Sequence, residues 1–166
     1  MTKTRVFQRG ETIPIWAEIK TWAGVLESPD QGVKLTITDP NRAIKAGRIS
    51  VLASTSFTFG LTVTGGTSGA TGVVIDKPDA TTLHLQQVTG TWVSGETITD
   101  TGSGESETDS ALTAAVMTES EEGKFVYYYT TDEAEAKGWW KVRCKGQDGL
   151  LGDAKYVITD GGFYLE

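Results

Sequence analysis

The middle of the chain carries one short pattern twice. The segments FTFGLTVTGGTSG (57–69) and WVSGETITDTGSG (92–104) start 35 residues apart, and each contains an aromatic residue, a glycine, a Thr-Val-Thr or Thr-Ile-Thr core and a closing Ser-Gly. One copy alone is too short to bury much apolar surface, whereas two copies that pair face to face form a small core. The repeat therefore predicts a compact β domain in the middle of the chain.

The sequence on either side of the repeat alternates between apolar and polar residues, which is typical of strands buried on one face. The pattern appears at residues 13–19, 33–38, 125–129 and 140–144, and Tyr156 and Ile158 close the set. Each flank supplies too few strands for a sandwich, but the two together supply about seven. We therefore predict an all-β chain in which an immunoglobulin-like sandwich (1–53 and 111–166) is interrupted by an inserted acidic, Gly/Thr-rich β domain (54–110). Three small units in tandem are the alternative arrangement.

Shorter segments receive more specific predictions. Residues 57–64 alternate as a strand, and the glycine-rich stretch after them is a turn. Residues 102–111 are expected to form a polar loop that leads back to the outer domain. Residues 42–53 fit either a connector or an edge strand. The segment TDEAEAKG (131–138) fits a single helical turn with Asp132 as its cap.

The negative charge of the chain is concentrated in its middle. The formal net charge is −7, and residues 54–110 carry −6 of it, because one lysine stands there against seven acidic residues. Phosphate backbones and anionic lipids repel such a segment, so we expect no nucleic-acid and no membrane partner. No apolar run approaches the roughly 18 residues that span a bilayer, and the first residues lack the apolar core of a secretory signal. The single cysteine, Cys144, excludes an intrachain disulfide and fits folding in a reducing cytoplasm.

No residue pattern points to catalysis or to a metal. His84 is the only histidine, so any Ser-His-Asp or Cys-His site would have to use it, and its place between two leucines is typical of an ordinary strand residue. The glycine-rich TGGTSGATG (64–72) lacks the Gly-Lys-Ser/Thr and the helix that follow in a phosphate-binding loop. Asp148, Asp153 and Asp160 fit turn aspartates better than calcium ligands. We predict no catalytic residue, no metal site and no cofactor.

The aromatic side chains exceed what one sandwich core needs. Adjacent pairs such as Trp139 and Trp140 point to opposite faces of a strand, so one member of the pair lies outside the core. Exposed rings of this kind anchor protein interfaces or stack on sugars. The insert or the C-terminal segment 161–165 could also cover such rings, and we favour protein contacts or covering over sugar binding. The expected contact residues are Trp22, Trp139 or Trp140, and the C-terminal residues Phe163, Tyr164 and Leu165.

The flanks and the insert each resemble known families. Four segments are similar to strands of immunoglobulin-like and macroglobulin-like β-sandwich modules: RGETIPIWAEI (9–19), VKLTITDPN (33–41), ESEEGKFVYYYTT (119–131) and GWWKVRCKG (138–146). The disulfide pair of antibody domains is absent. The phrase TGGTSGATG, followed by an aromatic-x-x-Gly-Glu-Thr-Ile-Thr unit, resembles a Gly/Thr-rich repeat of structural proteins from tailed bacteriophages.

The second resemblance implies a non-enzymatic virion component, made in the host cytoplasm and placed on the tail, at the neck or on the capsid surface as a decoration. Its partners would be capsid, portal, neck or tail subunits, together with further copies of the chain in the particle. A carbohydrate-binding or host-surface adhesion module is the alternative function. A small hydrolase that uses His84 is a weaker one.

Overall fold

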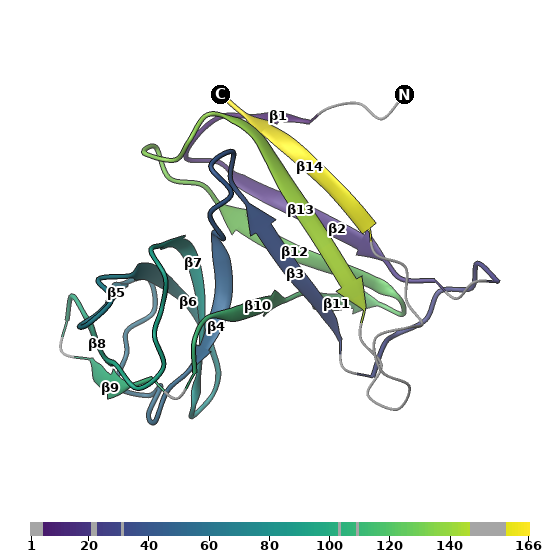
Figure 1. Cartoon of the computed structure of the whole chain (residues 1–166). Helices are drawn as coiled ribbons and strands as arrows, with labels where there is room; N and C mark the ends of the chain where they lie inside the picture. The colour runs from purple at the N-terminus through teal and green to yellow at the C-terminus, as the bar shows by residue number, and fades with distance from the viewer. Residues whose placement is uncertain (1–4, 21–22, 31, 103, 109, 147–158) are drawn as a thin grey trace. The chain divides into compact units, whose positions relative to one another are not determined.

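The computed structural model describes residues 5–20, 23–30, 32–102, 104–108, 110–146 and 159–166. Every regular element among them is a β-strand, which confirms the predicted all-β class. The chain forms two compact units, of which the outer comprises Met1–Arg42 and Val116–Glu166 and the inner comprises Ala43–Ala115 (Figure 1). The inner unit differs from the expected 54–110 mainly at its start, because residues 43–53 belong to it.

The outer unit is a sandwich of two sheets, with the orders β1-β14-β13-β3 and β11-β12-β2. Its main pairings join the two flanks of the chain, since Ile15 of β2 lies opposite Tyr127 of β12 and Leu35 of β3 lies opposite Cys144 of β13. Each sheet therefore needs strands from both flanks. The strands are β1 (Val6–Phe7), β2 (Thr12–Glu18), β3 (Val33–Thr38), β11 (Thr118–Glu121), β12 (Lys124–Thr130), β13 (Gly138–Gly146) and β14 (Thr159–Leu165).

The core of the outer unit is built by the inward residues of these strands and is rich in aromatic rings. Tyr129, Trp140 and Phe163 follow one another with ring centroids 5.8 and 5.6 Å apart, and Phe7 meets Phe163 edge-on at 6.0 Å. Because a buried aromatic side chain removes roughly 150–250 Å² from water, this cluster holds β1, β12, β13 and β14 together. The other buried apolar residues include Ile13, Ile15, Ile19, Val33, Leu35, Ile37, Phe125, Val142 and Leu165.

The connection between β12 and β13 is a turn, and its residues do not form the predicted single helical turn. Asp132 does cap it, because its carboxylate accepts a hydrogen bond from a backbone N–H two residues further on, at 2.7 Å. The Glu135 carboxylate accepts a hydrogen bond from the buried Tyr129 hydroxyl, and the Trp140 indole N–H donates to the Ala136 carbonyl at 2.9 Å. Burial, together with the Glu135 carboxylate, raises the pKa of Tyr129, so its hydroxyl stays a donor. The segment is too short to hold a helix by itself, and these tertiary hydrogen bonds decide its shape.

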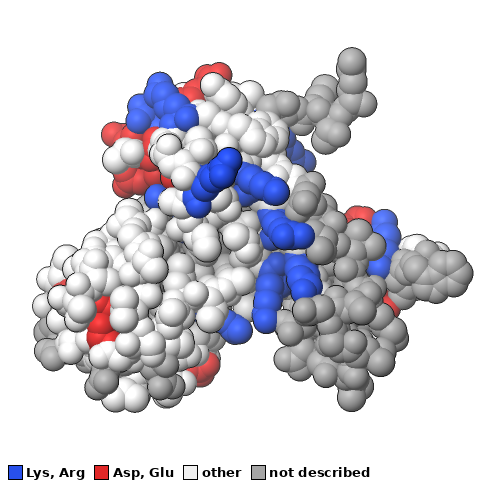
Figure 2. Space-filling model, viewed as in Figure 1, with Lys and Arg blue, Asp and Glu red and all other residues white. Residues whose placement is uncertain are grey.

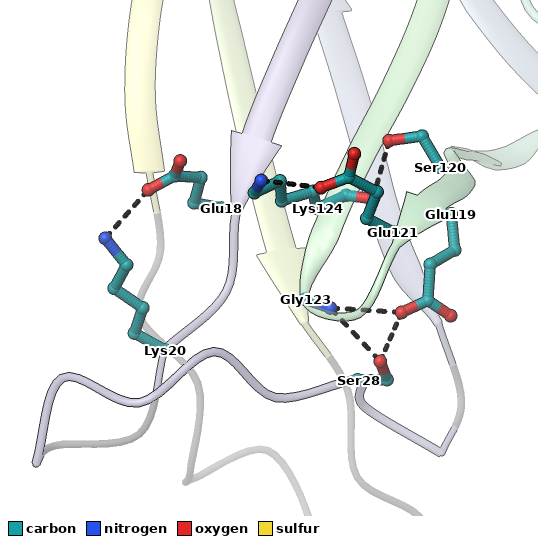
Figure 3. A network of polar contacts seen from close by, with 8 residues as sticks. All are labelled: Glu18, Lys20, Ser28, Glu119, Ser120, Glu121, Gly123 and Lys124. Carbon is teal, nitrogen blue, oxygen red and sulfur yellow. Dashed lines mark hydrogen bonds and ion pairs between the residues drawn. The ribbon is translucent and has the colours of Figure 1, made fainter.

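The tight turn between β11 and β12 requires glycine at position 123. Gly123 has a φ of +67°, and a Cβ there would lie 2.7 Å from the Glu27 nitrogen and 2.9 Å from the Ile19 carbonyl oxygen. Its N–H is shared between the Ser28 hydroxyl at 3.2 Å and the Glu119 carboxylate at 3.1 Å (Figure 3). The turn therefore ties the segment that follows β2 to the β11–β12 hairpin.

The inner unit is one curled sheet with the order β10-β4-β7-β6-β5-β8-β9. Its first and last strands pair, with Gly47 of β4 opposite Ala114 of β10, so the chain enters and leaves the unit at the same place. A Cβ on Gly47 would lie 2.5 Å from the Thr113 carbonyl oxygen, so only glycine permits this approach. The strands are β4 (Ala46–Ser50), β5 (Thr62–Gly65), β6 (Thr71–Asp79), β7 (Thr82–Thr89), β8 (Thr97–Asp100), β9 (Glu105–Glu107) and β10 (Thr113–Val116).

The curled sheet, labelled β4 to β9 in Figure 1, is closed by a bridge between the segments that follow β4 and β9. Val51, just after β4, forms a bridge with Thr108, just after β9, and the Thr108 carbonyl accepts the Gly95 N–H at 2.8 Å. The closed sheet surrounds a core of its own. The core consists of Ile49, Val51, Phe57, Val63, Ala70, Val74, Leu83, Leu85, Val88, Trp92 and Ile98, with Leu112 packed against it.

Two predictions for segments of the inner unit were wrong. Residues 42–53 are neither a connector nor an edge strand, because β4 lies between β7 and β10. The expected polar loop at 102–111 contains β9, which pairs with β8 and leads to the buried Thr108. The strand β9 has the sequence Glu-Ser-Glu, so no apolar alternation in the sequence indicates it.

The two copies of the repeat lie side by side in the sheet rather than face to face. Strands β5 and β8 pair antiparallel, with Thr64 opposite Thr99. The aromatic residue that opens each copy, Phe57 or Trp92, is only 2% exposed. The repeat therefore supplies two neighbouring strands to one sheet and two aromatic side chains to one core.

Each copy begins with a turn at its glycine instead of the expected strand. Gly60 has a φ of +82° and Gly95 a φ of +79°, a region that favours glycine. The turn explains why the predicted strand at 57–64 starts only at Thr62 and why Phe59 is 67% exposed.

Replacing Gly60 or Gly95 by alanine should destabilise the inner unit equally, by about 1–2 kcal/mol each. No atom lies within 4 Å of a Cβ at either position, so the loss comes from the backbone conformation alone. Urea unfolding measures the change. Gly161→Ala is the control, because Gly161 has an open environment and no positive φ. The free energy of unfolding of this variant should not fall below that of the wild type. A neutral effect at one of the two repeat glycines would show that the two turns are not equivalent.

Candidate interaction surfaces

The first glycine-rich turn of the repeat encloses a carboxylate. Glu96 accepts hydrogen bonds from the N–H groups of Thr67 at 3.2 Å, Ser68 at 2.9 Å and Val93 at 2.9 Å. A Cβ on Gly65 would lie 2.5 Å from this carboxylate, so the glycine provides room for it. The donors that a phosphate-binding loop would offer to an external anion are therefore occupied by a side chain of the chain itself.

The second glycine-rich turn encloses another carboxylate in the same way. Asp100 accepts hydrogen bonds from the N–H groups of Thr58 at 3.0 Å, Gly102 at 2.8 Å and Gly104 at 2.8 Å. Thr58 and Gly102 stand at the same repeat positions as two of the donors to Glu96, 35 residues away in each case. The two sites thus share equivalent donor positions, whereas both carboxylates belong to the second copy and lie at the two ends of β8.

Both carboxylates are structural anions. Burial by itself raises the pKa of Glu96 and of Asp100, but the hydrogen bonds from backbone N–H groups outweigh burial, and the pKa of each carboxyl is lowered. A general acid needs the opposite shift, so these groups stabilise turns rather than exchange protons. Within the described part of the chain, no group of three or more His, Cys, Asp or Glu residues is placed to hold a metal ion.

Acid should weaken the inner unit through these two groups. A carboxyl whose pKa is lower in the folded than in the unfolded chain adds stability that is complete above its ordinary pKa, about 4, and is lost as the pH falls through the folded-state value. Glu96→Gln should lower the melting temperature at pH 7 because the amide accepts fewer of the N–H donors. The difference between wild type and variant should shrink below about pH 4. Scanning calorimetry between neutral and acidic pH measures it.

The matched control for this experiment is Glu122→Gln, which changes an exposed carboxylate in the outer unit. Its melting curve should follow the wild type at every pH. A Glu96→Gln deficit that stays constant down to about pH 2.5 would contradict the assigned role of the ionised carboxylate.

His84 is a half-buried residue of β7. Its Nδ1 lies 3.6 Å from the Asp76 carboxylate on the neighbouring β6. Burial lowers the pKa of His84, Asp76 opposes this shift and Arg48 adds to it, so the ring is neutral at pH 7. The arrangement is that of a strand residue with a cross-strand partner, and the absence of catalysis stays a prediction.

The structure separates the residues that we expected at an interface. Trp139 and Tyr164 point outward, with 49% and 40% of their surface exposed, whereas Trp140, Phe163 and Leu165 are buried in the core. The C-terminal residues are therefore no free tail, because they form β14 between β1 and β13. The three buried side chains cannot reach a partner while the outer unit is folded. Several predicted residues lie outside the described part of the chain: Trp22, Asp148, Asp153, Tyr156 and Ile158.

An apolar patch covers the outward face of β2 and β12. Trp16 lies opposite Val126 and Pro14 lies opposite Tyr128. Because Val126 is only 8% exposed, the exposed β2–β12 patch consists of Trp16, Tyr128 and the half-buried Pro14. Trp16 and Tyr128 are 54% and 57% exposed. Strand alternation places both rings outward, but the sequence does not show that β2 and β12 are neighbours in this register, so the patch was not among the predicted contacts.

A second surface lies on the outward face of the other sheet, and it combines aromatic and basic side chains. Trp139 and Tyr164 lie opposite each other on β13 and β14. Further along, β13 presents basic residues outward, and Figure 2 shows the Lys and Arg side chains as a band over β13 and β3. The aromatic–basic face is defined by Val6, Lys34, Thr36, Thr38, Trp139, Lys141, Arg143, Lys145 and Tyr164.

Comparison with known proteins finds no matching family model, no similar curated protein and no similar solved structure. Among the described residues, no helix is long and apolar enough to span a bilayer.

Proposed function

We propose that the chain is a non-enzymatic structural component of a tailed-bacteriophage particle. It acts through contacts with neighbouring virion proteins, which are capsid, portal, neck or tail subunits and further copies of the chain. The protein is made in the host cytoplasm and resides in the virion. The resemblance of residues 57–104 to a phage-type Gly/Thr repeat supports the virion assignment.

The observation that carries the proposal is the β2–β12 patch. The residues of the patch are uncharged, and Glu18 lies opposite Lys124 as the next outward pair at its edge. Trp and Tyr are also the side chains that contribute most to binding at protein interfaces. Its rim is polar, with the hydroxyls of Thr12 and Thr130 3.0 Å apart. An apolar centre and a polar rim are typical of a protein contact surface.

The size of the patch favours assembly in many copies. Two rings that are each about half exposed present roughly 200 Å² of apolar surface, which contributes about 5 kcal/mol when covered. Association itself costs about 4–15 kcal/mol, so one such contact binds weakly. In a symmetric particle the same contact is repeated, and the effective concentration of each partner makes weak contacts sufficient.

The proposal is tested in particles. Mass spectrometry of tailed-phage particles, purified from cells that carry the gene, should identify the chain as a stoichiometric component. The double variant Trp16→Ser, Tyr128→Ser should enter particles at least about tenfold less than the wild type, which corresponds to about 1.4 kcal/mol. Both side chains are outward, so circular dichroism should show an unchanged fold.

Phe59→Ser is the matched control, because Phe59 is equally exposed but lies on the inner unit. This variant should enter particles as the wild type does. Absence of the chain from purified particles would overturn the virion assignment. Normal incorporation of the double variant would overturn the role of the β2–β12 patch.

A further inference from the structure

The aromatic–basic face has an apolar row at one end that crosses three strands. Val6 of β1 lies opposite Tyr164 of β14, and Tyr164 lies opposite Trp139 of β13. The three side chains are 52%, 40% and 49% exposed. The Trp139 ring extends over Gly162, where a Cβ would lie 2.8 Å from the ring, so glycine lets the indole lie close to the sheet.

A ladder of positive charges continues from this row along β13. Lys141, Arg143 and Lys145 alternate with buried residues and share the outward side with Trp139. Residues two positions apart on a strand are about 7 Å apart, so the ladder presents one positive charge at each such interval. Asp160 of β14 stands opposite Arg143 in register.

The ladder continues from β13 onto β3. Lys145 lies directly opposite Lys34, and the neighbouring outward residues of β3 are Thr36 and Thr38, which carry hydroxyls. Two lysines therefore face each other in register at this end of the sheet.

We propose that the aromatic–basic face binds an acidic polysaccharide. The rings of Trp139 and Tyr164 supply flat apolar surfaces on which sugar rings stack, and Lys141 with the lysines beyond it supplies positive charge for carboxylate or sulfate groups. Thr36 and Thr38 supply hydroxyls for hydrogen bonds to sugar hydroxyls. This gives the alternative function, carbohydrate recognition, a defined surface and a class of ligand. It does not depend on the assembly role of the β2–β12 patch.

Charge favours a polysaccharide over single-stranded nucleic acid at this face. The whole chain has a formal net charge of −7, which repels a polymer with a charge on every unit. An acidic polysaccharide with charges on only some of its sugars is repelled less, and it still meets the local ladder. The hydroxyls of β3 also match a ligand that is rich in hydroxyl groups.

Isothermal titration of the full chain with partly methyl-esterified oligogalacturonate, at low salt, tests the proposal. We expect a dissociation constant of about 1 mM or tighter that weakens as salt is raised. Trp139→Ala and Lys141→Gln should each weaken binding at least about fivefold. Amide resonances of β3, β13 and β14 should shift on titration.

Two variants on other parts of the outer unit serve as matched controls. Trp16→Ala removes an equally exposed tryptophan from the β2–β12 patch, and Lys20→Gln removes a lysine that pairs with Glu18 at 2.8 Å. Both should bind as the wild type does. Absence of binding, or equal losses in the control variants, would overturn the proposal. Tighter binding of oligothymidylate than of oligogalacturonate at the same salt would replace the polysaccharide by single-stranded nucleic acid and overturn it as well.

Discussion

The pairing of β4 with β10 is the contact on which the two-unit arrangement depends. These strands lead the chain into and out of the inner unit, and because Gly47 lies opposite Ala114 the two crossings are adjacent. A side chain at position 47 would collide with the Thr113 carbonyl, so the close approach requires glycine. With its ends held together, the insert acts as a folded loop, and β2 pairs with β12 along its whole length although the inner unit separates them in sequence.

Inside the inner unit, the backbone N–H groups of two glycine-rich turns need hydrogen-bond acceptors. Turns of this kind leave N–H groups without strand partners, and buried N–H groups need acceptors. Glu96 and Asp100 provide them from the two ends of β8. The same residues that make the segment acidic therefore hold its turns, and the glycine-rich loops do not remain open for an external anion.

The sequence predicted the parts of this fold that rest on local alternation. The strands β2, β3, β12 and β13 are each long enough to show period two, and their pairing across the flanks followed from strand count. The prediction failed at β14, because two glycines interrupt its apolar alternation. Phe163 and Leu165 of this strand are buried against residues far away in the sequence. The sequence also did not indicate that Glu96 is a buried hydrogen-bond acceptor, because N–H groups that donate to its carboxylate lie in a turn almost 30 residues earlier. The β2–β12 patch required the same long-range information, since alternation shows which way Trp16 points but not what lies beside it.

The outer unit thus offers two chemically different surfaces on opposite sheets, while the inner unit closes on itself. The central claim is that the inner unit is an independent domain whose own strands hold its ends together. The most direct measurement is an amide correlation spectrum of residues 43–115 alone, compared with that of the full chain. The account predicts a dispersed spectrum whose core resonances, such as those of Val63 and Ile98, coincide with those of the full chain. A collapsed spectrum, typical of an unfolded chain, would contradict it.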